Sequence, residues 1–216
     1  MSKHSIYLII YGEDGTAAPD PSAAARDAAD VGGELLALGP LAHVGETDAR
    51  SAPPWMAIAG FDTDSNAAAW YETAGPLLPG AALLVPAHTE PVWWPDELSG
   101  QRPPWTLQPG ALPFEPRLFV AVWSNVHDAD LFLLDYAVHF KWTVERNGGG
   151  WIASGLPTPL RGTLVPTATA LMAWPSNEVR KAWYDGADYL PYKKQRMASS
   201  DSTVVGIAAL RLRPGA

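Results

Sequence analysis

The chain contains two diverged copies of one pattern, and this internal repeat limits the folds open to it more than any other feature. Three pairs of segments match at nearly constant offsets of 112 to 116 residues: Ser5–Tyr11 with Arg117–Trp123, Val31–Gly39 with Asn147–Gly155, and Ala69–Glu72 with Ala182–Asp185. A repeat of this length is one folding unit rather than a short motif. The 216 residues therefore hold two related modules.

The second copy shows its elements most clearly. An apolar, β-branched run predicts a strand over 117–126, and Asp128 stands at the N-cap position of a helix over 129–146 that ends at Asn147-Gly148. Short strands follow over 151–154 and 167–174, with a loop containing Pro157, Pro159 and Gly162 between them. Ser176 caps a helical stretch over 177–196 that is interrupted near Gly186 and Pro191, and 203–212 forms the last strand. The predicted order is βαββαβ.

The first copy repeats this order with strands near 4–12, 34–38, 54–61 and 82–88. Asp20 caps a helix over 23–30, and Thr63 or Asp64 caps a helix over 65–74. Between the copies, residues 91–116 hold seven prolines and no period, which is typical of a semi-rigid linker. The predicted division is a module over 1–91, a Pro/Trp-rich linker over 92–115 and a module over 116–216.

A βαββαβ unit is the split βαβ, or ferredoxin-like, arrangement, in which two helices cover one face of a four-stranded antiparallel sheet. The other face is apolar and needs a cover, and a second copy in the same chain supplies one. We therefore predict an α+β fold in which two ferredoxin-like modules pack sheet to sheet as an intramolecular pseudo-dimeric barrel.

Composition excludes several classes of function. The absence of cysteine removes disulfides, thiolate nucleophiles and cysteine metal sites. With a net charge of −8 and no basic cluster beyond Lys193, Lys194 and Arg196, nucleic acid is not expected as a partner. No signal peptide or membrane span is visible, so we expect a cytoplasmic protein without a membrane partner. Ten tryptophans are compatible with a ligand cavity or simply with a large core.

Several segments of the second copy resemble an uncharacterised bacterial family of short dimeric α/β-barrel domains. The resembling segments are Ala173–Ser176, Lys181–Asp185, Asp188–Lys193, Asp201-Ser202 and Gly148-Gly149. The wider superfamily includes antibiotic-biosynthesis monooxygenases, polyketide cyclases, muconolactone-isomerase-like enzymes and haem proteins such as the chlorite dismutase group. The resemblance implies the barrel fold and a pocket between the sheet and helices of a module, whereas fold alone does not determine the reaction.

Candidate catalytic residues lie on the first helix of the second module. Asp135 and His139 are four residues apart and share one helical face, so the carboxylate could orient the imidazole as a general base, with Tyr136 nearby. The same pair is also compatible with an ordinary surface interaction. The alanine-rich first helix, over 23–30, leaves open that the first module holds the pocket instead.

Candidate substrate-binding residues come from the strand and helices around this site. Trp123 and Asn125 share one face of the first strand of the second module and could face the helices, although Asn125 and His127 also suit the strand-to-helix turn. Trp142 and Tyr184 complete the expected site, although the resemblance marks Tyr184 mainly as a helix-packing residue.

Cofactor sites are weakly indicated. His43 and His88 belong to no carboxylate pattern, no metal-binding spacing is present, and no glycine-rich nucleotide loop follows a strand. Haem would need one axial ligand, for which His139 or His127 could serve. We therefore expect a cofactor-independent enzyme, a monomer or homodimer, that cyclises, isomerises or oxygenates a hydrophobic aromatic or polyketide-like substrate. A non-catalytic ligand-binding protein and a haem enzyme are the alternatives.

Overall fold

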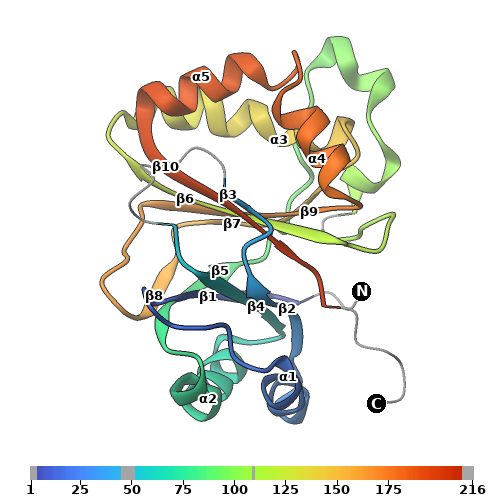
Figure 1. The fold of residues 1–216 in the computed structure, drawn as a ribbon. Coiled ribbons are helices and arrows are strands. Elements are labelled where there is room, and N and C mark those ends of the chain that lie inside the picture. The colour runs from blue at the N-terminus through green and yellow to red at the C-terminus, as the bar shows by residue number, and fades with distance from the viewer. Residues whose placement is uncertain (1–3, 45–51, 109, 211–216) are drawn as a thin grey trace.

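Two five-stranded antiparallel sheets pack face to face between outer layers of helices in the computed structural model, which describes residues 4–44, 52–108 and 110–210 (Figure 1). The first sheet has the order β2-β4-β1-β5-β8 and the second the order β3-β10-β6-β9-β7. The strand bounds are β1 Ile6–Gly12, β2 Glu34–Pro40, β3 His43–Val44, β4 Trp55–Phe61, β5 Gly80–Pro86, β6 Leu118–Val126, β7 Gly150–Gly155, β8 Thr158–Arg161, β9 Ala168–Trp174 and β10 Ser200–Ala208.

The strand orders confirm the predicted fold. In each sheet the four repeat-derived strands lie in the order fourth, first, third, second, which is the split βαβ topology. The helices lie on the two outer faces (Figure 1): α1 Pro21–Asp30 and α2 Asp64–Ala74 on the first sheet, and η4 Leu131–Ala137, α3 Val138–Arg146, α4 Asn177–Tyr184 and α5 Leu190–Ser199 on the second. Shorter 3₁₀ turns are η1 Gly75–Leu77, η2 Asp96–Gln101 and η3 Pro104–Leu107.

Helix starts follow the predicted caps. The side chains of Asp20, Thr63 and Ser176 accept hydrogen bonds from backbone N–H groups in the first turns of α1, α2 and α4. The Asp128 carboxylate accepts from Leu131 N at 3.1 Å and so caps the helical segment that carries η4 and α3. This segment differs from the prediction in one respect, because its first part is a π-helix rather than an α-helix.

Three apolar layers hold the molecule together. The middle layer lies between the sheets and contains side chains of both halves, such as Ile9, Ile58, Phe119 and Leu171. The two outer layers fill the space between each sheet and its helices. Both faces of every central strand are therefore buried, and β1 and β4 are buried along their whole length.

The two halves exchange edge strands. β3 of the first half pairs with β10, and β8 of the second half pairs with β5. The sequence predicted a loop where β8 forms, because Pro159 cannot donate to a ladder; the strand is tolerated because it lies at the edge of its sheet. Each of these two strands belongs to one half of the sequence and pairs in the sheet of the other half. The predicted division of the chain at 91 and 116 stays a prediction. The last strand, predicted over 203–212, starts three residues earlier, at Ser200, and ends at Ala208; residues 211–212 lie outside the described residues.

Candidate functional site

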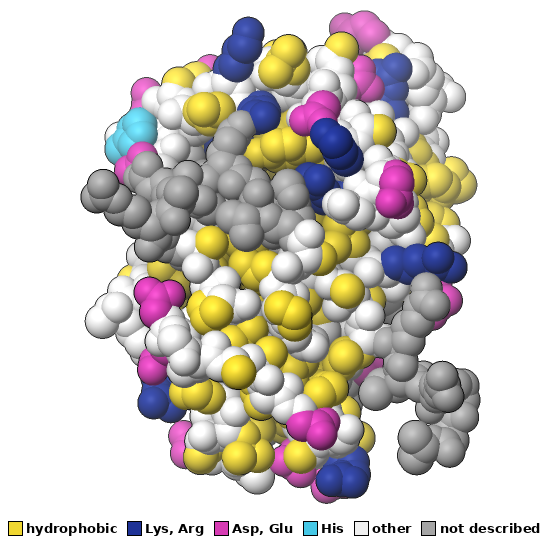
Figure 2. Space-filling view, viewed as in Figure 1, with side chains coloured by type: hydrophobic (Ala, Val, Ile, Leu, Met, Phe, Trp, Pro, Cys, Tyr) yellow, Lys and Arg dark blue, Asp and Glu magenta, His cyan; other side chains and the backbone are white. Residues whose placement is uncertain are grey.

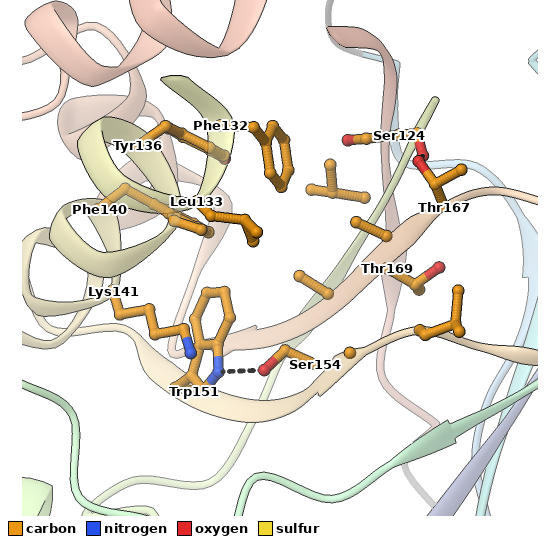
Figure 3. A pocket seen from close by; sticks show the side chains of 16 residues that line it. Ser124, Phe132, Leu133, Tyr136, Phe140, Lys141, Trp151, Ser154, Thr167 and Thr169 are labelled. Atoms are coloured by element: carbon orange, nitrogen blue, oxygen red, sulfur yellow. Dashed lines mark hydrogen bonds between the residues drawn. The ribbon is translucent and has the colours of Figure 1, made fainter. Parts of the chain in front are cut away.

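A cavity of about 340 Å³ lies in the second module, between the helical segment η4–α3 and the facing strands β6, β7 and β9 (Figure 3). This is the side of the sheet on which the family resemblance implies a pocket. Its lining residues are Val122, Ser124, Phe132, Leu133, Tyr136, Ala137, Phe140, Lys141, Trp151, Ser154, Gly155, Leu156, Thr167, Ala168, Thr169 and Ala170. Sites of this size hold small organic ligands.

The small side chains of α1 pack against a tryptophan in the first module. Ala24 and Ala28 are buried, and the Trp70 ring fills the space beside them, its indole N–H donating to the Ala24 carbonyl oxygen at 3.2 Å. A hollow of similar volume in this half lies elsewhere, between the end of α2 and β8 beside Tyr71 and Arg161. Beside the two buried alanines of α1, a tryptophan therefore occupies the space that their small side chains leave.

Aromatic rings form the helical wall of the pocket. Tyr136 and Phe140 stack with ring centroids 4.3 Å apart, and the Phe140 ring meets Trp151 of β7 edge to face at 4.9 Å. Phe132 continues this wall, 5.1 Å from the Tyr136 ring. Three of these four rings come from positions four residues apart in one helical segment. The π-helical turns of η4 contribute to this wall, and such turns are frequent at functional sites.

One end of the pocket is polar. The Lys141 ammonium lies 5.5 Å from the Trp151 ring centroid, and the Trp151 indole N–H donates to Ser154 Oγ at 3.2 Å (Figure 3). Burial lowers the pKa of Lys141, and the negative charge of Glu90 opposes that shift. Lys141 is the one charged residue among those that line the cavity.

Two of the hydroxyl groups at the opposite end, those of Ser124 and Thr167, form hydrogen bonds within the fold. Ser124 Oγ and Ser202 Oγ lie 2.6 Å apart. Thr167 Oγ1 accepts from the Val126 N–H at 2.8 Å and donates to the Ser124 carbonyl oxygen at 3.1 Å. These bonds join the end of β6 to β10 and to the residue that precedes β9, whereas the buried Thr169 Oγ1, which also lines the pocket, makes no hydrogen bond to any described residue.

Tyr136 belongs to a buried network behind the pocket. Its hydroxyl donates to Tyr189, while Arg196 lies close to Tyr189 and its guanidinium donates to Tyr184 Oη at 3.4 Å. Burial is the largest cause that raises the pKa of Tyr136 well above its ordinary value. The phenol is therefore neutral at physiological pH.

The structure places the predicted acid–base pair outside the cavity. Asp135 is exposed, and His139 lies on the outer side of the helix between Trp93 and Tyr192, with ring centroids 5.1 Å and 5.7 Å away. Neither Asp135 nor His139 is among the residues that line the cavity. Only Tyr136 of the predicted catalytic set lines the pocket.

The predicted substrate-binding residues also lie away from the cavity. Trp123 points to the other sheet, where its ring lies 4.3 Å from that of Tyr11, so the expectation that it faces the helices is wrong. Asn125 is exposed near the end of β6. Trp142 packs under the linker against Trp94, with centroids 5.9 Å apart. Tyr184 is buried in the helical layer, on the far side of the Tyr136 network.

The residues that do form the site were missed in part. Phe132, Phe140 and Lys141 lie on the same helical segment as the predicted pair, and the four-residue spacing of Phe132, Tyr136 and Phe140 was the available signal. Trp151 carries no such signal, because it reaches the pocket from strand β7 and not from the helical segment.

Metal ions and haem iron need ligating side chains at their site. Within residues 4–44, 52–108 and 110–210, no group of three or more His, Asp or Glu side chains could hold a metal ion. Neither His127, which is exposed, nor His139 lines the cavity, and the lining residues include no imidazole. The residues of this pocket therefore do not fit an imidazole-ligated haem.

One protein family matches part of the chain. Residues 118–210 match the DUF1330 family, described as a domain of unknown function. The DUF1330 match runs from β6 to just beyond β10, so it contains the whole pocket and covers less than half of the chain. No curated protein matches the chain.

Solved structures share the fold over nearly the whole chain. A mutant chlorite dismutase from Candidatus Nitrospira defluvii has a TM-score of 0.54 at 9% identity, covering 97% of this chain and 93% of that one. Another mutant of that protein, in complex with cyanide, has a TM-score of 0.52 at 9% identity, with coverages of 97% and 92%. An anthrone oxidase-like protein has a TM-score of 0.50 at 12% identity, also with coverages of 97% and 92%. At these identities the likeness shows the fold alone.

The charges on the surface and the length of the helices are relevant to nucleic-acid and membrane partners. On the face shown in Figure 2, acidic and basic side chains are interspersed with hydrophobic ones. No helix in the described ranges is both long and apolar enough to cross a bilayer.

Proposed function

We propose that the protein is an enzyme that binds a hydrophobic, aromatic or polyketide-like small molecule in the pocket of the second module. The reaction is a cyclisation, an isomerisation or an oxygenation that uses no cofactor. The observation that carries the proposal is the cavity itself, whose wall of Phe132, Tyr136, Phe140 and Trp151 meets a single cationic side chain, Lys141. An anthrone oxidase-like protein shares this fold, so an oxygenation of an aromatic compound is compatible with the fold.

The pocket residues would act by confinement and by charge. Flat aromatic walls hold a flexible or planar substrate in one conformation and exclude water, which raises the rate of a reaction within that substrate. The Lys141 ammonium stands where negative charge on a substrate oxygen would be stabilised. His139 and Asp135 have no step in this proposal, because they lie outside the cavity.

Two alternatives share the same fold. A haem enzyme needs an axial ligand, and neither His127 nor His139 lies at the pocket. A non-catalytic binding protein would use the same cavity and differ only in turnover. A visible spectrum of the purified protein distinguishes the haem enzyme from the other two possibilities, because a Soret band would indicate haem.

We further propose that the protein acts in the cytoplasm as a monomer or homodimer.

The test combines binding with turnover. Aromatic and polyketide-like compounds are screened by calorimetry, and the bound ones are incubated with the protein, oxygen and a chelator before mass analysis of the products. Ala170→Phe fills the cavity, and Ala198→Phe on the exposed side of α5 is the matched control. We expect Ala170→Phe to abolish binding and turnover and Ala198→Phe to leave both intact. Ligands that bind but are never converted would favour the binding-protein alternative, and full activity of Ala170→Phe would exclude this pocket.

A further inference from the structure

We infer that the substrate is an aromatic organic acid, a carboxylate or phenolate, whose charged oxygen lies against Lys141 at the Trp151 end of the pocket. This inference rests on the proposed function, since it names the substrate class of the same site. It follows from the charges, the hydrogen-bond donors and the shape of that end.

The charge at this end is unbalanced. No carboxylate of the described residues lies within ion-pair distance of Lys141, and no acidic side chain lines the cavity. Glu90 is near enough for its charge to act on Lys141 but does not form a contact pair with it. A partly buried ammonium without a counter-ion is costly, and an anionic ligand would offset that cost. In a chain of net charge −8, a pocket with only a cation is a selective site for anions.

The donors at this end suit an oxygen anion. Ser154 Oγ accepts the Trp151 indole N–H at 3.2 Å, which leaves the serine its own O–H proton to donate. Figure 3 shows the Lys141 amine and the Ser154 hydroxyl on either side of the Trp151 indole nitrogen, at the same end of the cavity. An ammonium and a hydroxyl together can serve both oxygens of a carboxylate or the one oxygen of a phenolate.

The rest of the pocket suits the aromatic part of such a molecule. From the Lys141 end, the cavity continues along Phe140 and Phe132 on the helical side and along small side chains, Ala168 and Ala170, on the sheet side. A flat ring system fits between an aromatic wall and a sheet floor of alanines. A cationic ligand of the same shape is disfavoured, because its charge would meet that of Lys141.

The experiment compares three probes that share one naphthalene ring and carry a negative, a neutral or a positive substituent. Binding of 2-naphthoate, 2-naphthamide and 2-naphthylmethylammonium is measured by calorimetry at pH 7 for the full chain and for Lys141→Met, Lys141→Arg and Lys194→Met. Lys194 is exposed on α5, so Lys194→Met is a matched control for the loss of one positive charge. Thermal unfolding verifies that each variant is folded, and Lys141→Arg retains a cation at the site if Lys141→Met is unstable.

The expected result is that 2-naphthoate binds at least about tenfold more tightly than the amide, which corresponds to the strength of one charge-assisted contact. That preference should disappear in Lys141→Met and persist in Lys141→Arg and Lys194→Met. Equal affinity for acid and amide, or a preference that survives Lys141→Met, would overturn the inference while leaving the proposed function intact. Failure of all three probes to bind, or binding that Ala170→Phe does not affect, would instead contradict the proposed function and the inference with it.

Discussion

Glu145 and Trp151 are joined across the end of α3 by a hydrogen bond in which the Trp151 N–H donates to Glu145 Oε1 at 2.8 Å. The Glu145 side chain is buried, with a residue exposure of 4%. Burial raises the pKa of Glu145 to about 7, and the hydrogen bond from Trp151 opposes that rise. The wall of the pocket is therefore held by a carboxyl group whose charge state changes near neutral pH.

Glu145→Gln should change how stability depends on pH. Because the folded pKa of about 7 exceeds the ordinary 4.5, the native state holds a proton that the unfolded state has lost, so stability falls as pH rises from about 4.5 to about 7. Glutamine keeps the acceptor for Trp151 without this cost. We expect the variant to gain up to about 3 kcal/mol on the wild type between pH 5 and pH 8, measured by chemical denaturation. The exposed Glu97→Gln is the control, and identical pH profiles for Glu145→Gln and the wild type would refute the account.

Asp128→Ala should weaken the helix that carries the aromatic wall. The Asp128 carboxylate caps this helix through Leu131 N at 3.1 Å, and loss of such a cap costs about 1 kcal/mol. Asp128→Asn retains a side-chain oxygen acceptor and should remain close to the wild type. Denaturant unfolding of the three proteins measures the difference, and equal losses in both variants would mean that the charge, rather than the cap, is responsible.

The fold was predictable because the repeat and its caps are local signals. Asp20, Thr63 and Ser176 cap the helices they were expected to cap, and the two copies of βαββαβ leave little choice of topology. The edge strand β8 was missed because Pro159 argues against a strand unless its edge position is known.

The site was less predictable because the sequence does not show which face of β6 lies toward the helices. Residues 118–124 are all buried, one face against the other sheet and one against the helices, so no polar face marks the outside. Trp123 was expected to face the helices, whereas Val122 and Ser124 do so. The surroundings of the Lys141 ammonium are formed by the Trp151 ring and the Glu90 charge. These residues lie in other segments of the chain, and no sequence spacing connects them with Lys141.

Tyr136→Phe and Tyr189→Phe should be coupled. The Tyr136 hydroxyl donates to Tyr189 in a buried setting, and removing one partner of such a bond costs about 1–2 kcal/mol. Once one hydroxyl is gone, loss of the second should cost less, so the double variant should be more stable than the sum of the single losses implies. Unfolding free energies of the four proteins give the coupling. Strict additivity would show that the two phenols do not interact.

The affinity for 2-naphthoate should depend on pH through Lys141. Burial lowers the pKa of Lys141 from its ordinary 10.5, so the ammonium that holds an anion is lost at a lower pH than for an exposed lysine. His88, which lies near Lys141, has a pKa lowered to about 4, first by its own burial and then by the Lys141 charge, and it stays neutral throughout.

Titrations from pH 6 to pH 10.5 should therefore show binding that weakens with a midpoint below 10.5, while the carboxylate of the probe remains ionised. Glu90→Gln should move the midpoint further down, because the Glu90 charge supports the ammonium. Lys141→Arg should abolish the decline, since a guanidinium stays charged over this range. A constant wild-type affinity up to pH 10.5, or a decline that Lys141→Arg retains, would mean that Lys141 is not the group that holds the anion.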